Sequence, residues 1–179
     1  AAAAGGALIP VSLRRAEEGD ESRITATYHP VSAEYLPALG IPLVAGRWFG
    51  DEDMRVASGF VINEALARRL APQGSALGVR ITVPRSSQAR QDFGQPITLR
   101  VVGVVGNVRL NGPESAPDPE VLLPYTLEVW PWMRFSVRAG TLSPEQLLRG
   151  IETSVKEVEP GIEFLGKPSV VRSGMAAVD

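Results

Sequence analysis

The sequence predicts an α+β fold in which a β-rich module is inserted into a mixed module of strands and helices. Several short segments alternate apolar and polar residues, as one-sided strands do, and two longer segments repeat apolar residues at helical spacing. The pattern also shifts along the chain from mixed to mostly β and back. We therefore expect residues 51–130 to form the inserted β-rich module, and residues 1–50 and 131–179 to form the discontinuous α+β module.

The first elements that the sequence predicts are a strand and a short helix. Residues 22–32 alternate apolar and polar side chains and are rich in β-branched types, which indicates a strand with one buried face. Ser32 is expected to cap a short helix over residues 33–40, and Gly40 is expected to end it.

An almost wholly apolar segment, residues 41–49, follows this helix. Pro42 and Gly46 interrupt it, so we expect extended, bent chain and assign these two residues as a hinge between the modules. Trp48 and Phe49 are expected to line a junction or partner surface. We also expect at least two of three side chains to be largely buried: Leu39, Ile41 and Leu43.

The middle of the chain reads as strands with one helix. A short apolar strand over residues 60–62 leads into Asn63, a typical N-cap, and a helix through Leu70. Residues 79–84 alternate as a strand does. A polar loop, typical of a long hairpin connection, joins them to residues 97–110, the strongest strand signal in the chain.

The last third adds two strands, a helix and a final strand. Residues 120–126 and 132–140 have strand patterns. Ser143, with the proline and the glutamine that follow it, forms a capping box ahead of a helix over residues 144–159. Residues 162–166 are expected to form the final strand.

Composition excludes several classes of protein. The net charge is −2 and charges of both signs are interspersed without a basic block, which argues against nucleic acid as a partner. The chain has no cysteine, which excludes disulfides, thiolate catalysis and zinc–cysteine sites. No apolar run reaches the roughly 18 residues that a membrane helix needs. The chain opens without methionine, and we expect it to be a piece of a longer protein.

Few residues have a pattern that suggests chemistry. His29 is the only histidine, and its place at a strand end favours a structural or solvated role over catalysis. The acids at 51–53 could bind a hard cation, but a helix start explains them better. Neither a phosphate-binding loop nor a nucleophile elbow is present. We therefore predict no catalytic, cofactor-binding or metal-binding residue, and no cofactor.

Trp130 and Trp132 flank a proline, so both cannot face one core from a regular strand. One of them would be exposed to a partner or a lipid surface. Packing of both at a junction between modules is an equally good interpretation.

Five segments in a fixed order resemble a known family. They are "VSAEYLPALGIPLVAGRWF", "FVINEALARRLAP", "ALGVRITV", "LRVVGVVGNVRLNG" and "PEVLLPYT". Together they resemble the extracytoplasmic core domain of MacB-type ABC transporter permeases, the broad FtsX-like group. The resemblance covers residues 22–166, and it carries no functional motif in the two long loops.

The resemblance implies a porter-like α/β sandwich module interrupted by a β-rich one, on the periplasmic side of a bacterial inner membrane. It implies a non-catalytic domain that couples ATP-driven motion to substrate export or partner binding. The implied partners are the transmembrane helices of the same permease, a separate or fused ATPase domain and a periplasmic adaptor protein. A stand-alone solute-binding or adaptor module is the alternative, and a small hydrolase is a third class.

Overall fold

The computed structural model describes residues 2–5, 9–16, 23–56, 58–85, 91, 93–108, 116–128, 134–137 and 141–164. Strands and helices are mixed, which confirms the predicted α+β class. The strands are β1 (Ala2–Gly5), β2 (Ile9–Arg15), β3 (Ile24–Val31), β4 (Leu43–Gly46), β5 (Phe60–Asn63), β6 (Arg80–Pro84), β7 (Pro96–Val105), β8 (Glu120–Pro124) and β9 (Arg134–Val137). The helices are α1 (Tyr35–Leu39), α2 (Glu64–Leu70), the 3-10 turn η1 (Tyr125–Leu127) and α3 (Pro144–Val158).

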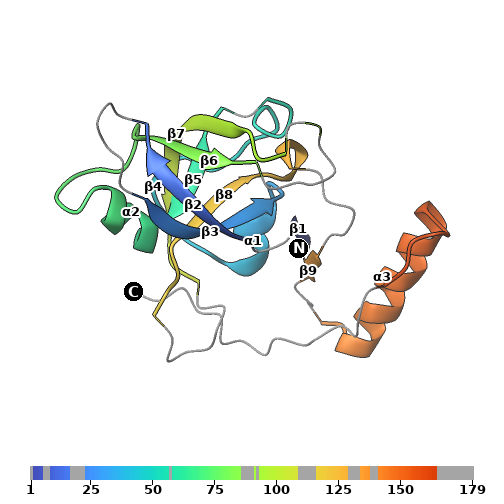
Figure 1. Ribbon diagram of the computed structural model, residues 1–179. Helices are drawn as coiled ribbons and strands as arrows, with labels where there is room; N and C mark the ends of the chain where they lie inside the picture. Colours follow the sequence, from blue (N-terminus) through green and yellow to red (C-terminus); the bar gives the residue numbers. More distant parts are fainter. Residues whose placement is uncertain are drawn as a thin grey trace.

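Six of these strands pair in a closed ring, in the order β2-β6-β7-β5-β8-β3 and back to β2. The β3–β8 and β5–β7 pairs are parallel, and the other pairs of the ring are antiparallel. β4 pairs with β7 outside this path, and β1 joins β3 to β9. Figure 1 shows the ring strands wrapped around one another, with α3 to one side.

The ring encloses an inner hydrophobic cluster. Successive side chains of a strand point to opposite faces, so every second residue of each ring strand reaches the interior. Phe60 and Ile62 of β5 do so, and α2 adds Leu66 and Leu70 at one end of the ring. All four are almost completely buried.

An outer cluster covers one side of the ring. Val61 and Leu122, the alternate residues of β5 and β8, point outward and are buried there. α1 packs Tyr35 and Leu36 over them. α1 is only five residues long, too short to be stable in isolation, so this packing holds it in place.

Asn63 links three elements of the ring at the N-terminus of α2. Its side chain is completely buried, and its Oδ1 accepts from the amides of Leu66 and Glu120. Its Nδ2 donates to the Asp118 carbonyl. The predicted N-cap is confirmed, and the same side chain also ties β8 to the end of β5.

Most predicted elements are confirmed, including the long hairpin between β6 and β7 and the capping box at Ser143. Two expectations about the elements were wrong, and two strands were missed. Ser32 does not cap α1: the N-cap is Glu34, whose side chain makes no capping bond. Residues 162–164 are not a strand, and the strands β1 and β2 were missed.

The predicted boundary at residue 50 does not fall at a break in the sheet. β2 and β3, from the first 50 residues, pair with β6 and β8 of the range 51–130. The reason is that closing the ring brings together strands far apart in sequence, both in the antiparallel β2–β6 pair and in the parallel β3–β8 pair. The division of the chain into two modules stays a prediction.

We predict that Asn63→Ala lowers the free energy of unfolding by about 2–4 kcal/mol, because it removes a helix cap and leaves the Leu66 amide, the Glu120 amide and the Asp118 carbonyl without this partner. Urea denaturation checks this. Ser143→Ala removes the exposed cap of α3 and is expected to cost only about 0.5–1 kcal/mol. Equal losses in the two variants would contradict the linking role of Asn63.

Candidate functional site

The strongest candidate site is the junction segment, residues 41–50, which runs from α1 across the outer side of the ring. It begins at Ile41, which is buried in the outer cluster, and passes through β4. The amide of Gly106 donates to the carbonyl of Pro42, and the amide of Arg47 donates to that of Val102. Backbone bonds to the β7 region therefore hold the segment near both its ends.

Gly46 allows the junction segment to lie close against β7. Its φ is +73°, in the left-handed region that glycine tolerates. A β-carbon at this position would collide with the Val102 carbonyl oxygen and lie 2.8 Å from Leu77 Cδ2. Only glycine fits here, so the predicted role of Gly46 in setting the bend has a steric basis.

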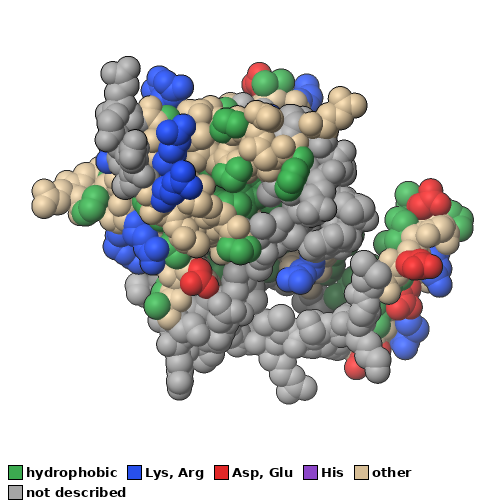
Figure 2. Space-filling view, in the orientation of Figure 1, with side chains coloured by type: hydrophobic (Ala, Val, Ile, Leu, Met, Phe, Trp, Pro, Cys, Tyr) green, Lys and Arg blue, Asp and Glu red, His purple; other side chains and the backbone are tan. Residues whose placement is uncertain are grey.

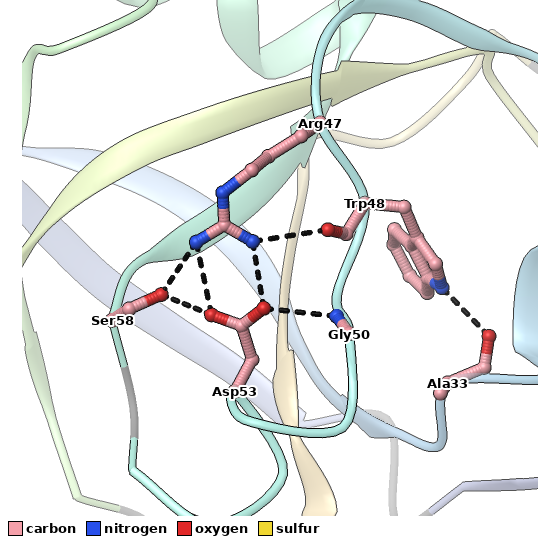
Figure 3. A network of polar contacts seen from close by, with 6 residues as sticks. All are labelled: Ala33, Arg47, Trp48, Gly50, Asp53 and Ser58. Carbon is pink, nitrogen blue, oxygen red and sulfur yellow. Dashed lines mark hydrogen bonds and ion pairs between the residues drawn. The ribbon is translucent and has the colours of Figure 1, made fainter.

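A charged contact, the Arg47–Asp53 clasp, closes the loop after β4. Arg47 Nη1 donates to Asp53 Oδ2 at 2.6 Å and Nη2 donates to Oδ1 at 3.0 Å, as Figure 3 shows. The Gly50 amide and the Ser58 hydroxyl also donate to the Asp53 carboxylate. Asp53 is 5% exposed, and its carboxylate accepts hydrogen bonds from Arg47, Gly50 and Ser58.

The electrostatics of the clasp favour the ionised carboxylate. Hydrogen bonds from the Arg47 guanidinium are the main reason that the pKa of Asp53 lies well below its usual range, and Ser58 and Gly50 add to the effect. The bidentate geometry fixes the guanidinium plane as well as its position. The clasp therefore ties Arg47, just after β4, to the turn that carries Asp53 at neutral pH.

The two aromatic residues of the junction segment fasten it to α1. Trp48 Nε1 donates to the Ala33 carbonyl at 2.7 Å, and Figure 3 shows the indole pointing toward that residue. Phe49 is buried in the outer cluster, with its ring centroid 4.6 Å from that of Trp48. The predicted junction surface at these two residues thus faces the protein's own core.

His29 lies beneath α1 in a buried polar group. Its Nδ1 is 2.5 Å from Glu120 Oε1, across the parallel β3–β8 pair. The Tyr35 ring meets it edge-on, with centroids 4.9 Å apart. Burial raises the pKa of Tyr35, and the Glu120 charge raises it further. His29 is only 7% exposed, in agreement with the structural interpretation.

The other residues singled out in the sequence differ in how far they are exposed. Only Ile41 of the three side chains expected in the core is largely buried; Leu39 is partly buried and Leu43 is 43% exposed. The expectation that at least two of them are largely buried was wrong, because β4 pairs with β7 outside the closed path of the ring and Leu43 is left facing solvent. Pro42 is exposed at the start of the segment. Trp130 and Trp132 lie outside the described residues.

The clasp was missed at the sequence level, where the acids at 51–53 were interpreted as a helix start. Residues 51–55 form a turn instead. The signal in the sequence was an arginine and an aspartate on either side of Gly50, a spacing that a turn can close.

Across the described ranges, no group of three or more His, Asp or Glu side chains is placed to hold a metal ion. Of the described helices, none is long and apolar enough to cross a bilayer.

The sequence matches the family described as the MacB-like periplasmic core domain over residues 2–160. The fold is similar to the periplasmic region of MacB from Actinobacillus actinomycetemcomitans, with a TM-score of 0.60 and 14% identity over 87% of this chain and 66% of that one. It is also similar to a domain of a putative permease protein from Porphyromonas gingivalis, with a TM-score of 0.58 and 20% identity over 88% and 69% of the two chains. The chain spans about two thirds of these structures. No curated protein sequence matches it.

We predict that Asp53→Asn lowers the free energy of unfolding by about 1–2 kcal/mol at neutral pH, a modest loss because the Arg47 side chain is half exposed. Asp51→Asn removes the same charge from an exposed neighbour and should change stability by less than about 0.5 kcal/mol. Urea denaturation of both variants measures the difference. Equal effects would mean that general charge, and not the clasp, is responsible.

The contribution of the clasp should depend on acid pH. Because the pKa of Asp53 is lowered on folding, its stabilisation is complete above the ordinary aspartate pKa, about 3.9, and is lost as the pH falls further. The stability gap between the unaltered protein and Asp53→Asn should therefore be constant from neutral pH to about 5 and shrink below about 4. A gap that persists unchanged at the lowest pH where both proteins fold would refute the assignment.

Proposed function

This chain belongs to the family of MacB-like periplasmic core domains, and from that premise we propose that it is a non-catalytic domain that transmits motion within an ABC transporter. As a member of the family it is an extracytoplasmic domain of a MacB-like permease. ATP-driven movement of the membrane part would reach exported substrate, or a bound partner, through this domain.

The observation that supports transmission is the double fastening of the junction segment. On one side, Trp48 and Phe49 fix it to the α1 region. On the other, Gly46 and the Arg47 amide hold it against β7. A segment fixed to both neighbours moves with both of them, so a displacement of α1 is carried to the ring instead of being absorbed between them.

The position of α1 determines which parts of the domain the junction segment connects. α1 lies next to β1 and β9, the strands at the end of the sheet farthest from β7 in the pairing order. The junction segment links that end to β7. We infer that the α1, β1 and β9 group and the ring move as one body, with Pro42 and Gly46 setting a fixed bend.

The proposed partners follow from membership of the family. They are the transmembrane helices of the same permease, a separate or fused ATPase domain and a periplasmic adaptor protein. The absence of catalysis is supported by the one histidine, since His29 is buried between Glu120 and Tyr35, away from any substrate in solution.

We predict that Pro42→Gly loosens the bend without removing any side-chain contact in the core, because Pro42 is exposed and its carbonyl bond to Gly106 is a backbone bond. Spin labels at Arg134→Cys on β9 and Ser12→Cys on β2 measure the distance across the domain, in a full permease otherwise free of cysteine. The unaltered junction should give one narrow distribution, identical with and without ATP. Pro42→Gly should broaden it.

Pro72→Gly is the matched control, because Pro72 is also exposed but follows α2. It should leave the distribution narrow, and ATP hydrolysis should be the same in all variants. A distance that changes with ATP in the unaltered junction would show a flexing joint and contradict rigid transmission. A narrow distance distribution in Pro42→Gly would show that the bend has no mechanical role and that the segment only packs against the core.

A further inference from the structure

Three arginines share the outer face of β2, β6 and β7. Arg80 and Arg100 are directly opposite each other in the β6–β7 ladder, and Arg14 is opposite Thr82 in the β2–β6 pair. Ile81, between Arg80 and Thr82, points into the inner cluster, so the arginines point outward. All three are exposed, and Figure 2 shows Lys and Arg side chains gathered on the side of the molecule where β2 lies.

Nothing in the described part of the chain neutralises this arginine face. The ion pairs found there join Arg47 to Asp53, Arg85 to Glu128 and His29 to Glu120, and none involves the three arginines. Like charges directly opposite in a sheet are destabilising. The chain as a whole has a net charge of −2, so the cluster is not a by-product of a basic composition.

The exposed part of this face includes the three arginines, and within the described ranges it is free of large exposed apolar groups. α1 packs over β5 and β8, on another part of the ring. The junction segment pairs with the Gly103–Val105 end of β7 and not at Arg100. Among the described residues, no exposed large hydrophobic side chain lies on β2, β6 or β7. Thr82, on the same face, is buried, and its hydroxyl is hydrogen-bonded to that of Thr98 at 2.7 Å. The arginines are therefore the charged groups that this face presents to a ligand.

We propose that the arginine face docks an acidic segment of a protein partner. A guanidinium binds a carboxylate through two parallel hydrogen bonds, and three of them on adjacent strands fit a run of carboxylates. A lipid surface fits less well, because interfacial binding needs aromatic or aliphatic residues among the basic ones. Charge complementarity also accelerates encounter, at the cost of sensitivity to salt. This inference does not depend on the mechanical role of the junction segment.

The test uses a fluorescein-labelled polyglutamate peptide as the probe and the 179-residue chain as the protein. Fluorescence anisotropy should show binding that weakens as NaCl is raised, and NMR amide shifts should cluster on β2, β6 and β7. The variant R80Q/R100Q should raise the Kd about tenfold or more. R55Q/R149Q removes the same charge from exposed positions on other elements and should leave the Kd unchanged.

Three results would overturn the proposal. If R80Q/R100Q and R55Q/R149Q weaken polyglutamate binding equally, the binding is general electrostatic attraction and not recognition by the arginine face. Binding to phosphatidylglycerol vesicles without binding to polyglutamate would assign the face to lipid. A melting temperature of R80Q/R100Q below that of the unaltered protein at low salt would mean that the arginines stabilise the fold. Because the substitutions relieve repulsion between like charges, we expect the melting temperature to stay equal or rise.

Discussion

The architecture depends on one constraint, which is that β8 must pair with β3 on one side and β5 on the other. That position closes the ring and divides the side chains of β5 and β8 between an inner and an outer cluster. The buried amide of Asn63 fixes it, because the same oxygen that starts α2 also accepts from the first amide of β8. The outer cluster formed in this way then provides the surface on which α1 and the junction segment lie.

Local pattern predicted most of the elements and failed where structure depends on distant pairing. Asn63 as a cap and the β6–β7 hairpin follow from neighbours in sequence. β1, a run of alanine and glycine, has low strand propensity and exists through its pairing with β9. In the candidate site, a bend at Gly46 could be expected from the sequence, but the close approach of Val102 that excludes a β-carbon could not. For the Arg47–Asp53 clasp, the sequence carries only the spacing of an arginine and an aspartate around Gly50. Which of the acids at 51–53 pairs with Arg47 depends on the turn that the fold forms. The arginine face was invisible for the same reason, since its members come from three strands.

Charge is used in two opposite ways on this domain. At the clasp, an arginine and a carboxylate satisfy each other, and the desolvated aspartate gains further donors from Gly50 and Ser58. On the arginine face, two guanidinium groups stand opposite each other without a described counter-charge. The first arrangement makes the fold rigid. In the second arrangement, we expect a partner that brings carboxylates to gain charge-assisted hydrogen bonds with the arginines.

The closed ring also has a kinetic consequence. Its parallel β3–β8 pair joins residues about 90 positions apart, as His29 and Glu120 show with a separation of 91. Contacts of such long range form slowly, because the intervening chain must be restrained first. A periplasmic chain is translocated from one end, so β2 and β3 emerge with open edges and wait for β8. Unpaired strand edges favour aggregation, so the interval before β8 pairs with β3 is one in which this domain is open to it.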